Sequence, residues 1–550
     1  MIMIMKGSEI LAEALKRQGV DTFFFIMGGP MLLAESSCID RGLRAVDVRH
    51  EQAAAMMAHA YARLQNRPGI CMAASGPGTT NLITGVAHAW ADCTPVIAIG
   101  GSSPLATTGQ GVFQECDQLA MFEPCTKWAA RVHHAKRIPE LVAKAFHQSM
   151  SGKPGPVYLD LPGDVLYQDV DEADIDWPVP WSPESRPRPV AEPARIEQII
   201  GLLEKAEKPV IVSGSGILWA DAAAELEAWV EASGIPFYTT PQSRGVIAED
   251  HPYCYLTARS TAFREADLIM VIGTRMNYVI GHAAPPRFNA DATLVRIDID
   301  ATEISNSPRL DVGVIGDAKA VLQQLAEAAE GRLNAGTYQP WRDRLRGRNT
   351  SKQAEQEAIL DTNATPIHPL RLCKEIREFI DRDAILVVDG QEILNYARQT
   401  IPSFAPGHRL NSGAFGTMGV GMPFGVGAKI AKPDSQVVVL HGDGSFGLNA
   451  MEFDTAVRHD VPVLVIISLN GGWTADPDKD KPGRELGYTR YDQIAAALGG
   501  HAEFVEQPGD IRPALERAAA AVADGKPALV NVVTDWSARA TTAAFTVYST

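Results

Sequence analysis

The sequence lacks a basic excess, a cysteine pattern and a long apolar run. Its formal net charge is −16, which argues against a duplex nucleic-acid partner, because such binders carry a basic face. The seven cysteines are scattered without a CxxC pair, which favours buried reduced thiols over disulfides or a metal site. No apolar run could span a membrane, and the apolar stretch at residues 1–6 is too short for a signal peptide. We expect a soluble, cytoplasmic protein without nucleic-acid or membrane partners. The negative charge does not exclude small phosphorylated ligands, because a few local N–H groups can bind them.

Short apolar runs alternate with helical patterns along the whole chain. This alternation is typical of parallel sheets with helices on both faces, and 550 residues suggest about three domains. We predict an α/β protein with three doubly wound parallel-sheet domains over residues 1–180, 190–340 and 360–550. A Pro-rich segment at 177–193 and a polar segment at 341–365 are predicted linkers. The predicted strands are 22–26, 70–73, 95–99, 157–160, 209–213, 268–272, 293–299, 384–388, 436–440, 463–468 and 529–533, and helices are predicted at 7–19, 51–63 and 451–457.

A turn in the last third carries the first chemical signal. An apolar strand runs directly into Gly442-Asp443-Gly444-Ser445, and the next strand ends at Asn470. In α/β sheets ligands sit at the carboxyl ends of strands, and glycines let a diphosphate approach the backbone. Carboxylate, amide and carbonyl oxygens beside phosphates suit Mg²⁺. Two ordinary strand-ending turns would be the alternative, and a lone Gly-Asp-Gly would not exclude it. The spaced asparagine makes a cofactor site the stronger interpretation.

At this point the chain resembles the thiamine diphosphate enzymes, whose signature is Gly-Asp-Gly, about two dozen residues, then Asn-Asn. Here 25 residues (445–469) separate Gly444 from Asn470, and Leu469 stands where the first Asn usually sits. The family's second Asn is the metal ligand, so this departure spares the metal site. The resemblance implies three Mg²⁺ ligands, namely Asp443, Asn470 and the carbonyl of Gly472, and cofactor contacts from Gly444, Ser445, Gln391 and Glu392.

A carboxylate begins an Ala- and Met-rich helix in the first domain. Glu51, within Arg49-His50-Glu51-Gln52-Ala53-Ala54, could simply favour a helix N-terminus. The family carries Arg-His-Glu-x-x-Ala here, which implies that Glu51 exchanges a proton with the cofactor's pyrimidine ring. The resemblance also implies that Met418 wedges the cofactor into a V shape and that the Gly416 carbonyl accepts its amino group. In the family these two parts meet between subunits, which predicts a homodimer or a tetramer of dimers.

The loop that contains Phe113-Gln114-Glu115 bears on the substrate. Acetohydroxyacid synthases and 2-hydroxyacyl-CoA lyases carry Phe-Gln-Glu here, whereas oxalyl-CoA decarboxylases usually carry Tyr-Glu-Glu. The resemblance implies that Gln114 hydrogen-bonds a substrate hydroxyl and that Phe113 packs on an alkyl group. A loop with one buried aromatic residue is the structural alternative.

The middle domain carries Gly273-Thr274-Arg275-Met276-Asn277-Tyr278, a Gly-x-Arg-x-Asn-aromatic pattern of the branch that handles coenzyme A. In that branch the domain can bind ADP, with Arg275 at a phosphate and Asp298 or Asp300 at the ribose; a vestigial domain is the alternative. Arg259 is a candidate for the CoA phosphates. Tyr488, Tyr491 and a C-terminal lid that includes Arg539 are further pocket candidates, although the tail could also be a frayed end. Gln493 receives no role.

The resemblance covers nearly the whole chain and favours a 2-hydroxyacyl-CoA lyase. Such an enzyme cleaves a carbon–carbon bond to release an aldehyde or ketone and formyl-CoA, and it also runs the reverse acyloin condensation. Oxalyl-CoA decarboxylase is the first alternative, and acetohydroxyacid synthase, which a bound flavin would support, is the second. A non-catalytic nucleotide-binding scaffold is disfavoured because Glu51, Asp443 and Asn470 are all present.

Overall fold

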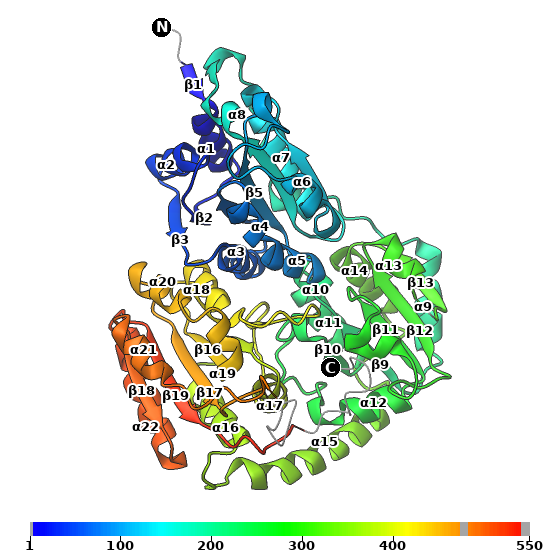
Figure 1. Cartoon of the computed structure of the whole chain (residues 1–550). Coiled ribbons are helices and arrows are strands. Elements are labelled where there is room, and N and C mark those ends of the chain that lie inside the picture. Colours follow the sequence, from blue (N-terminus) through cyan, green and yellow to red (C-terminus); the bar gives the residue numbers. More distant parts are fainter. Residues whose placement is uncertain (1–3, 308, 474–481, 541–550) are drawn as a thin grey trace.

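The computed structural model describes residues 4–307, 309–473 and 482–540. Three parallel sheets flanked by helices follow one another along the chain (Figure 1). The first sheet has the order β3-β2-β4-β5-β7-β6. Its strands are β2 (Thr22–Ile26), β3 (Arg44–Asp47), β4 (Gly69–Ala73), β5 (Val96–Ser102), β6 (Trp128–Arg131) and β7 (Val157–Pro162). A small antiparallel pair, β1 (Ile4–Lys6) with β8 (Asp169–Asp171), lies beside it.

The other two sheets repeat this parallel arrangement. The central sheet, of order β10-β9-β11-β12-β13, contains β9 (Pro209–Ser213), β10 (Phe237–Thr239), β11 (Leu268–Ile272), β12 (Thr293–Asp298) and β13 (Val312–Ile315). The third sheet, of order β15-β14-β16-β17-β19-β18, contains β14 (Ile385–Asp389), β15 (Arg409–Asn411), β16 (Val437–Gly442), β17 (Leu464–Leu469), β18 (His501–Val505) and β19 (Ala528–Val533). The predicted α/β class with three parallel-sheet domains is confirmed.

Helices connect successive strands in all three domains. The first domain contains α1 (Gly7–Arg17), α2 (Leu32–Asp40), α3 (Glu51–Gln65), α4 (Pro77–Asn81), α5 (Ile83–Ala91), α6 (Gln118–Phe122), α7 (Ile138–Met150) and α8 (Gly163–Tyr167). The central domain contains α9 (Pro193–Leu203), α10 (Gly216–Trp219), α11 (Ala223–Ser233), α12 (Arg259–Glu265), α13 (Ala301–Ser305) and α14 (Ala318–Ala329). The third contains α16 (Pro369–Phe379), α17 (Glu392–Thr400), α18 (Gly421–Ala431), α19 (Asp443–Leu448), α20 (Glu452–Arg458), α21 (Tyr491–Ala497) and α22 (Ile511–Ala523).

The strands predicted from the sequence are the interior strands of the three sheets. Every interior strand within the described residues overlaps a predicted one, whereas both edge strands of each sheet were missed. The interior strands are buried on both faces and therefore appear as continuous apolar runs. Edge strands such as β3 and β6 are only partly buried, so their sequences carry a weaker apolar signal.

The predicted second linker at 341–365 is wrong. Residues 339–360 form α15 (Gln339–Leu360), the helix that crosses from the central to the third domain (Figure 1). Its sequence is rich in Arg, Gln, Glu and Ala, which favour helix without producing an apolar stripe. Only a few side chains anchor it; Trp341, for example, is buried and donates its indole N–H to the Pro209 carbonyl at 3.1 Å. The Pro-rich linker at 177–193 has no α-helix or strand before α9.

The first and third domains share one apolar core. Helix α3 packs along α18, and Met56, Met57 and Phe424 belong to the same buried cluster. The contact is close: a Cβ at Gly427 would lie 2.5 Å from the Met57 carbonyl oxygen. The central domain has its own core. This shared core fixes the N-terminus of α3, with Glu51, against the third domain of the same chain.

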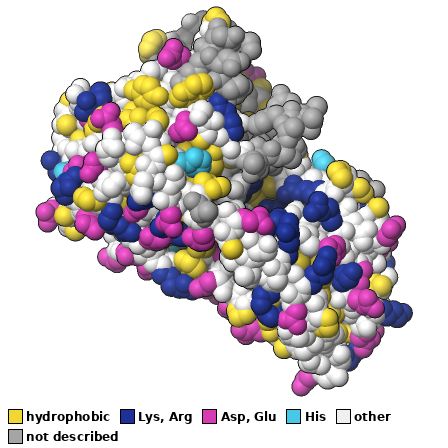
Figure 2. All heavy atoms as spheres, turned by 90° about the horizontal axis from the view of Figure 1, so that it is seen from below, with side chains coloured by type: hydrophobic (Ala, Val, Ile, Leu, Met, Phe, Trp, Pro, Cys, Tyr) yellow, Lys and Arg dark blue, Asp and Glu magenta, His cyan; other side chains and the backbone are white. Residues whose placement is uncertain are grey.

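The surface carries charged side chains of both signs. Figure 2 shows acidic and basic side chains mixed over the face it presents. All seven cysteines are free, and five are buried while Cys116 and Cys254 are partly exposed. No helix in the described part of the chain has both the length and the apolar character needed to cross a membrane.

Candidate active site

A cavity of about 220 Å³ lies at the carboxyl ends of β14, β16 and β17. We call it the diphosphate pocket. All of its described lining residues come from the third domain. They include the residues that the sequence assigned to cofactor and metal: Gln391, Glu392, Met418, Asp443, Gly444, Ser445, Asn470 and Gly472.

Asp443 and Asn470 meet because β16 and β17 are neighbours, with Gly442 opposite Ser468. Asp443 is almost fully buried, and its two carboxylate oxygens accept from the N–H groups of Gly444 and Gly471, each at 2.8 Å. Glycine is required at 444, because a Cβ there would lie 2.7 Å from the Trp473 ring. A buried carboxylate, an amide oxygen and a nearby carbonyl form the oxygen-donor set that Mg²⁺ prefers. The residues present therefore fit a magnesium diphosphate.

The segment that carries Gly416 and Met418 is tied down beneath this pocket. Asp389, at the end of β14, accepts from the Gly421 N–H at 2.8 Å, and the buried ring of His441 lies 3.7 Å from its carboxylate. Burial raises the pKa of Asp389 to about 6 and lowers that of His441 to about 3. Met418 lines the pocket, whereas Gly416 lies outside its described lining in a left-handed conformation with φ of 70°.

The first-domain candidates gather around a different turn, between β4 and α4. Glu51 accepts from the Asn81 amide at 2.9 Å, and the Ser75 hydroxyl donates to the Gln114 amide oxygen at 3.0 Å. Gln114 itself is held at φ of 59°. Phe113 is 86% exposed, which contradicts the alternative of a loop with one buried aromatic residue. The fold therefore brings Glu51 and Gln114 to the same turn.

Helix α3 is tied at its N-terminus to the third domain of the same chain. Glu452, on α20, accepts from the backbone N–H groups of Arg49 and His50 at 3.1 and 3.2 Å. Gln52 donates to Asn449 at 2.9 Å. Burial raises the pKa of Glu452 to about 7. Glu51 thus has a fixed place, yet it does not belong to the described lining of the diphosphate pocket of its own chain.

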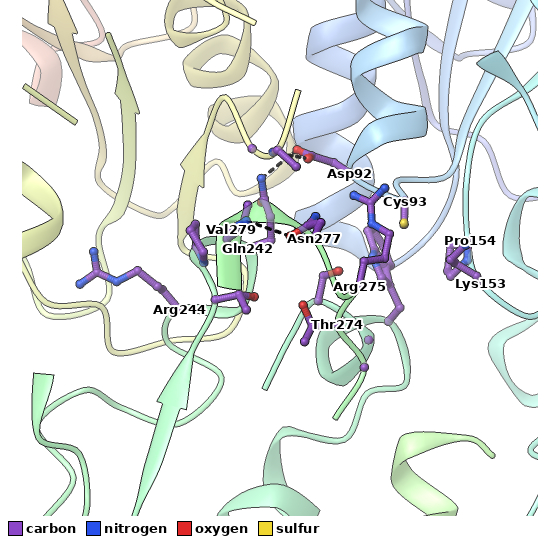
Figure 3. A pocket seen from close by; sticks show the side chains of 18 of the residues that line it. Asp92, Cys93, Lys153, Pro154, Gln242, Arg244, Thr274, Arg275, Asn277 and Val279 are labelled. Carbon is purple, nitrogen blue, oxygen red and sulfur yellow. Dashed lines mark hydrogen bonds between the residues drawn. The ribbon is translucent and has the colours of Figure 1, made fainter. Parts of the chain in front are cut away.

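A second cavity lies where all three domains meet, and we call it the central cavity. Figure 3 shows Asp92, Cys93 and Lys153 of the first domain and Arg275 of the central domain around it. Arg398 and Gln391 of the third domain also line it. Gln391 lines both cavities, so the two are adjacent.

Arginines dominate one wall of the central cavity. Burial, together with neighbouring guanidinium groups, lowers the pKa of Arg259 and of Arg409 to about 9. Nitrogens of Arg244, Arg259 and Arg409 have no hydrogen-bond partner among the described residues. Arg244 has one carboxylate partner, Glu249, at 2.7 Å. Unpaired buried donors of positive charge are costly, so this wall fits an anionic ligand. Arg244, Arg398 and Arg409 were not predicted as ligand contacts from the sequence, because they come from separate segments without a shared motif.

The two aspartates that the sequence suggested for a ribose occupy different positions. Asp298 lines the central cavity, and burial raises its pKa to about 6. Asp300 caps α13 through the Thr302 N–H at 2.9 Å and pairs with Lys153 at 2.6 Å, and it does not belong to the described lining of the cavity.

The candidates near the C-terminus lie beside the diphosphate pocket rather than in its described lining. Arg539 donates to the carbonyl of Ala538 at 2.9 Å. Tyr491 donates to the Asp443 carbonyl at 3.4 Å, and Tyr488 is about half exposed. The rest of the expected lid, residues 541–550, lies outside the described residues.

His59, His88 and Asp92 form a buried cluster near the central cavity whose ligand atoms lie within 4.8 Å of one another. The Asp92 carboxylate already accepts from His88 at 3.1 Å, Gln242 at 2.8 Å and the Ala414 N–H at 3.2 Å. Burial alone would raise the pKa of Asp92, but His88, His59 and Arg63 outweigh it and lower the pKa to about 2. With a buried guanidinium close by, the cluster forms a polar junction rather than a cation site.

Known proteins match the chain along most of its length. Three family models match: the N-terminal TPP binding domain of thiamine pyrophosphate enzymes at 5–121, their central domain at 196–325 and their C-terminal TPP binding domain at 393–532. A probable acetolactate synthase of Mycobacterium bovis is 34% identical over 541 residues, 96% of each chain. Oxalyl-CoA decarboxylase of Escherichia coli K12 is 32% identical, over 96% of this chain and 95% of that one. Human 2-hydroxyacyl-CoA lyase 1 is 30% identical, over 96% and 94%.

Proposed function

The chain belongs to the thiamine pyrophosphate enzymes, and within this family we propose that it is a 2-hydroxyacyl-CoA lyase. It is a thiamine diphosphate-dependent carbon–carbon lyase or decarboxylase. The relatives at 30–34% identity carry three different activities in their names, so overall similarity does not select one. The proposed reaction splits a 2-hydroxyacyl-CoA into an aldehyde or ketone and formyl-CoA.

The observation that carries the proposal is the arginine wall beside the diphosphate pocket. Because Gln391 lines both cavities, an anionic ligand of the central cavity lies next to the reacting centre. Guanidinium groups bind phosphates through paired hydrogen bonds. A CoA thioester carries such phosphates, as would ADP or a flavin dinucleotide, whereas pyruvate carries none; the wall therefore favours a phosphorylated ligand, and the substrate panel below separates the candidates. Gln114, held beside Glu51, offers an amide to the substrate hydroxyl.

The third-domain residues would hold the cofactor. Asp443, Asn470 and the Gly472 carbonyl would bind Mg²⁺, with Gln391, Glu392, Gly444 and Ser445 at the diphosphate. Met418 would support the bent cofactor, and the Gly416 carbonyl would accept its amino group. When bound, thiamine diphosphate supplies a carbanion that attacks carbonyl carbon. Glu51 would hold the proton at the pyrimidine nitrogen, and Phe113 would cover the alkyl group and exclude water.

We propose a homodimer, or a tetramer of dimers, as the active form. The proposal is supported by the position of Glu51 outside the described lining of its own chain's pocket, which a second copy would complete. Large apolar side chains are exposed near both parts of the site, as expected for an interface. They are Phe113, Met121, Phe415, Leu448 and Met451. Size measured in solution at micromolar concentration tests this, and an active monomer would contradict it.

ADP is a second candidate ligand for the central cavity. Gly216, Gly273 and Asp298 lie at the carboxyl ends of β9, β11 and β12, where α/β domains bind nucleotides. Asp298 would accept a ribose hydroxyl. Calorimetric titration with ADP tests this assignment, and Asp298→Asn should weaken binding about 10-fold. Equal affinity in the variant would remove Asp298 from the proposal.

A substrate panel tests the main proposal. Purified enzyme with thiamine diphosphate and Mg²⁺ is incubated separately with 2-hydroxyacyl-CoA thioesters, oxalyl-CoA and pyruvate, with Glu51→Gln as the matched control. We expect formyl-CoA together with an aldehyde or ketone from the first substrate. Formyl-CoA with CO₂ from oxalyl-CoA alone would favour the decarboxylase. Acetolactate from pyruvate, with flavin absorbance in the purified protein, would overturn the proposal.

A further inference from the structure

The central-domain segment 273–278 reaches both other domains. It follows β11, and Gly273 takes a left-handed conformation with φ of 60°. Arg275 then hydrogen-bonds the carbonyl of Ala91, at the end of α5 in the first domain. The hydroxyl of Tyr278 donates to the carbonyl of Ala414 in the third domain at 2.6 Å. The two distinctive side chains of this motif therefore bond to protein rather than pointing freely into the cavity.

The Ala414 peptide is held from both sides. Its N–H donates to Asp92 at 3.2 Å and its carbonyl accepts from Tyr278. Asp92 follows Ala91, the residue that Arg275 binds, so these contacts close a ring through all three domains. Figure 3 shows the Asp92 carboxylate facing Gln242, which donates to it at 2.8 Å. The ring is tight, because a Cβ at Gly413 would lie 2.1 Å from the Asp92 carboxylate.

The ring anchors one end of the segment that carries the proposed cofactor contacts. Gly416 and Met418 follow Ala414 by two and four residues, and the Gly416 N–H donates to the Ser412 carbonyl at 3.0 Å. The other end is anchored by Asp389, which accepts from the Gly421 N–H at 2.8 Å. Both anchors hold main-chain groups, so they fix where the Gly416 carbonyl and the Met418 side chain lie relative to the diphosphate pocket.

We propose that Tyr278 and Asp92 are positioning residues for the 414–418 segment. Neither belongs to the described lining of the diphosphate pocket; they act through the backbone of Ala414. The inference rests on the proposed roles of Gly416 and Met418. A displaced segment would leave the diphosphate anchored while the pyrimidine end of the cofactor is misplaced, and small misplacements of reacting groups are costly in rate.

Tyr278→Phe tests this, because it removes one hydroxyl and keeps the ring. The matched control is Tyr238→Phe, whose buried hydroxyl has no hydrogen-bond partner among the described residues. In the protein without cofactor, we expect amide hydrogen exchange across 411–418 to rise about 5-fold in Tyr278→Phe, since one hydrogen bond is lost. With cofactor, we expect kcat to fall about 10-fold, while the dissociation constant for magnesium thiamine diphosphate and the thermal midpoint stay as in the control.

Near-ultraviolet circular dichroism provides a further readout, because the signal of the bound cofactor depends on how its pyrimidine end is held and should change only in Tyr278→Phe. Exchange and kcat equal to those of the control would overturn the proposal. A parallel loss of cofactor affinity and thermal midpoint would also overturn it, by assigning Tyr278 a general structural role. The exchange and binding measurements need no substrate, so they stand even if the lyase proposal fails.

Discussion

The diphosphate pocket and the central cavity differ in where their residues come from. The described lining of the first belongs to one domain and follows three neighbouring strand ends, whereas the second takes residues from all three domains. The first offers glycine turns and acidic or amide oxygens, and the second offers arginines. The difference indicates that the proposed cofactor site is formed within one domain, while the proposed recognition site forms only where the three domains pack together.

The largest effect should come from Glu51, a proposed cofactor contact from the first domain that lies outside the pocket's described lining. Glu51→Gln keeps the size of the side chain and its place in the first turn of α3 but cannot exchange a proton. We expect kcat to fall about 1000-fold, within the usual range for a proton-transferring group, with cofactor affinity unchanged. Steady-state kinetics and cofactor titration measure the two quantities. Full activity would sink the assigned role, and a large loss of affinity would place Glu51 among the anchors instead.

Removing the local anchor should give the opposite pattern. Asp443→Ala deletes a proposed direct metal ligand, whereas changing even an outer partner of a ligand costs about 10–100-fold in affinity. We expect magnesium-dependent affinity for thiamine diphosphate to fall by about 100-fold or more in a fluorescence titration. Asp434→Ala, at an exposed position between α18 and β16 of the same domain, is the control. Unchanged affinity in Asp443→Ala would contradict the locally encoded site.

The same difference between the two cavities explains which residues could be predicted from the sequence. Asp443 and Asn470 lie at consecutive interior strand ends, so motif spacing and strand order together placed them in one pocket. Edge strands and α15 were missed because they lack a continuous apolar pattern. Asp92 and Arg409 were missed for a different reason: they become neighbours of the central cavity only through domain packing, and no local pattern records it. Tyr278 appeared in the sequence as part of a nucleotide motif, but in the fold its hydroxyl binds Ala414.

A pH experiment can test the burial of the central cavity without ligand. Burial raises the pKa of Asp298 from 3.8 to about 6, so the folded protein binds this proton more tightly than the unfolded chain. The resulting stabilisation is fully present below about pH 3.8 and is lost as pH rises through about 6. Over that window the free energy of unfolding should fall by up to about 3 kcal/mol through this group.

Asp298→Asn should remove this dependence on pH. The unfolding midpoint of the variant should therefore rise relative to that of the wild type as the pH increases from about 4 to about 7. Asp291→Asn, at an exposed position of the same domain, should instead follow the wild type. Parallel pH curves for wild type and Asp298→Asn would show that the carboxylate is hydrated, and the central cavity would then be open to water at this end.

The smallest effect should come from one arginine among several. Arg398, on α17, lines the central cavity. Its pKa is lowered mainly by burial and further by the nearby charge of Arg244. Arg398→Gln removes one cation while Arg259 and Arg409 remain. We expect KM for an acyl-CoA substrate to rise about 10-fold, the value of one charged hydrogen bond, with kcat within about 2-fold. Salt should weaken wild-type binding more than that of the variant.

The matched control is Arg332→Gln, which removes a guanidinium that pairs with Glu204 at 2.9 Å on the surface of the central domain. That variant should keep the wild-type KM, because exposed ion pairs contribute little. If Arg398→Gln lowered kcat and left KM unchanged, the arginine wall would act on the reacting centre through α17 rather than on the phosphates. The two cavities would then act as one site, joined at Gln391, which lines both of them.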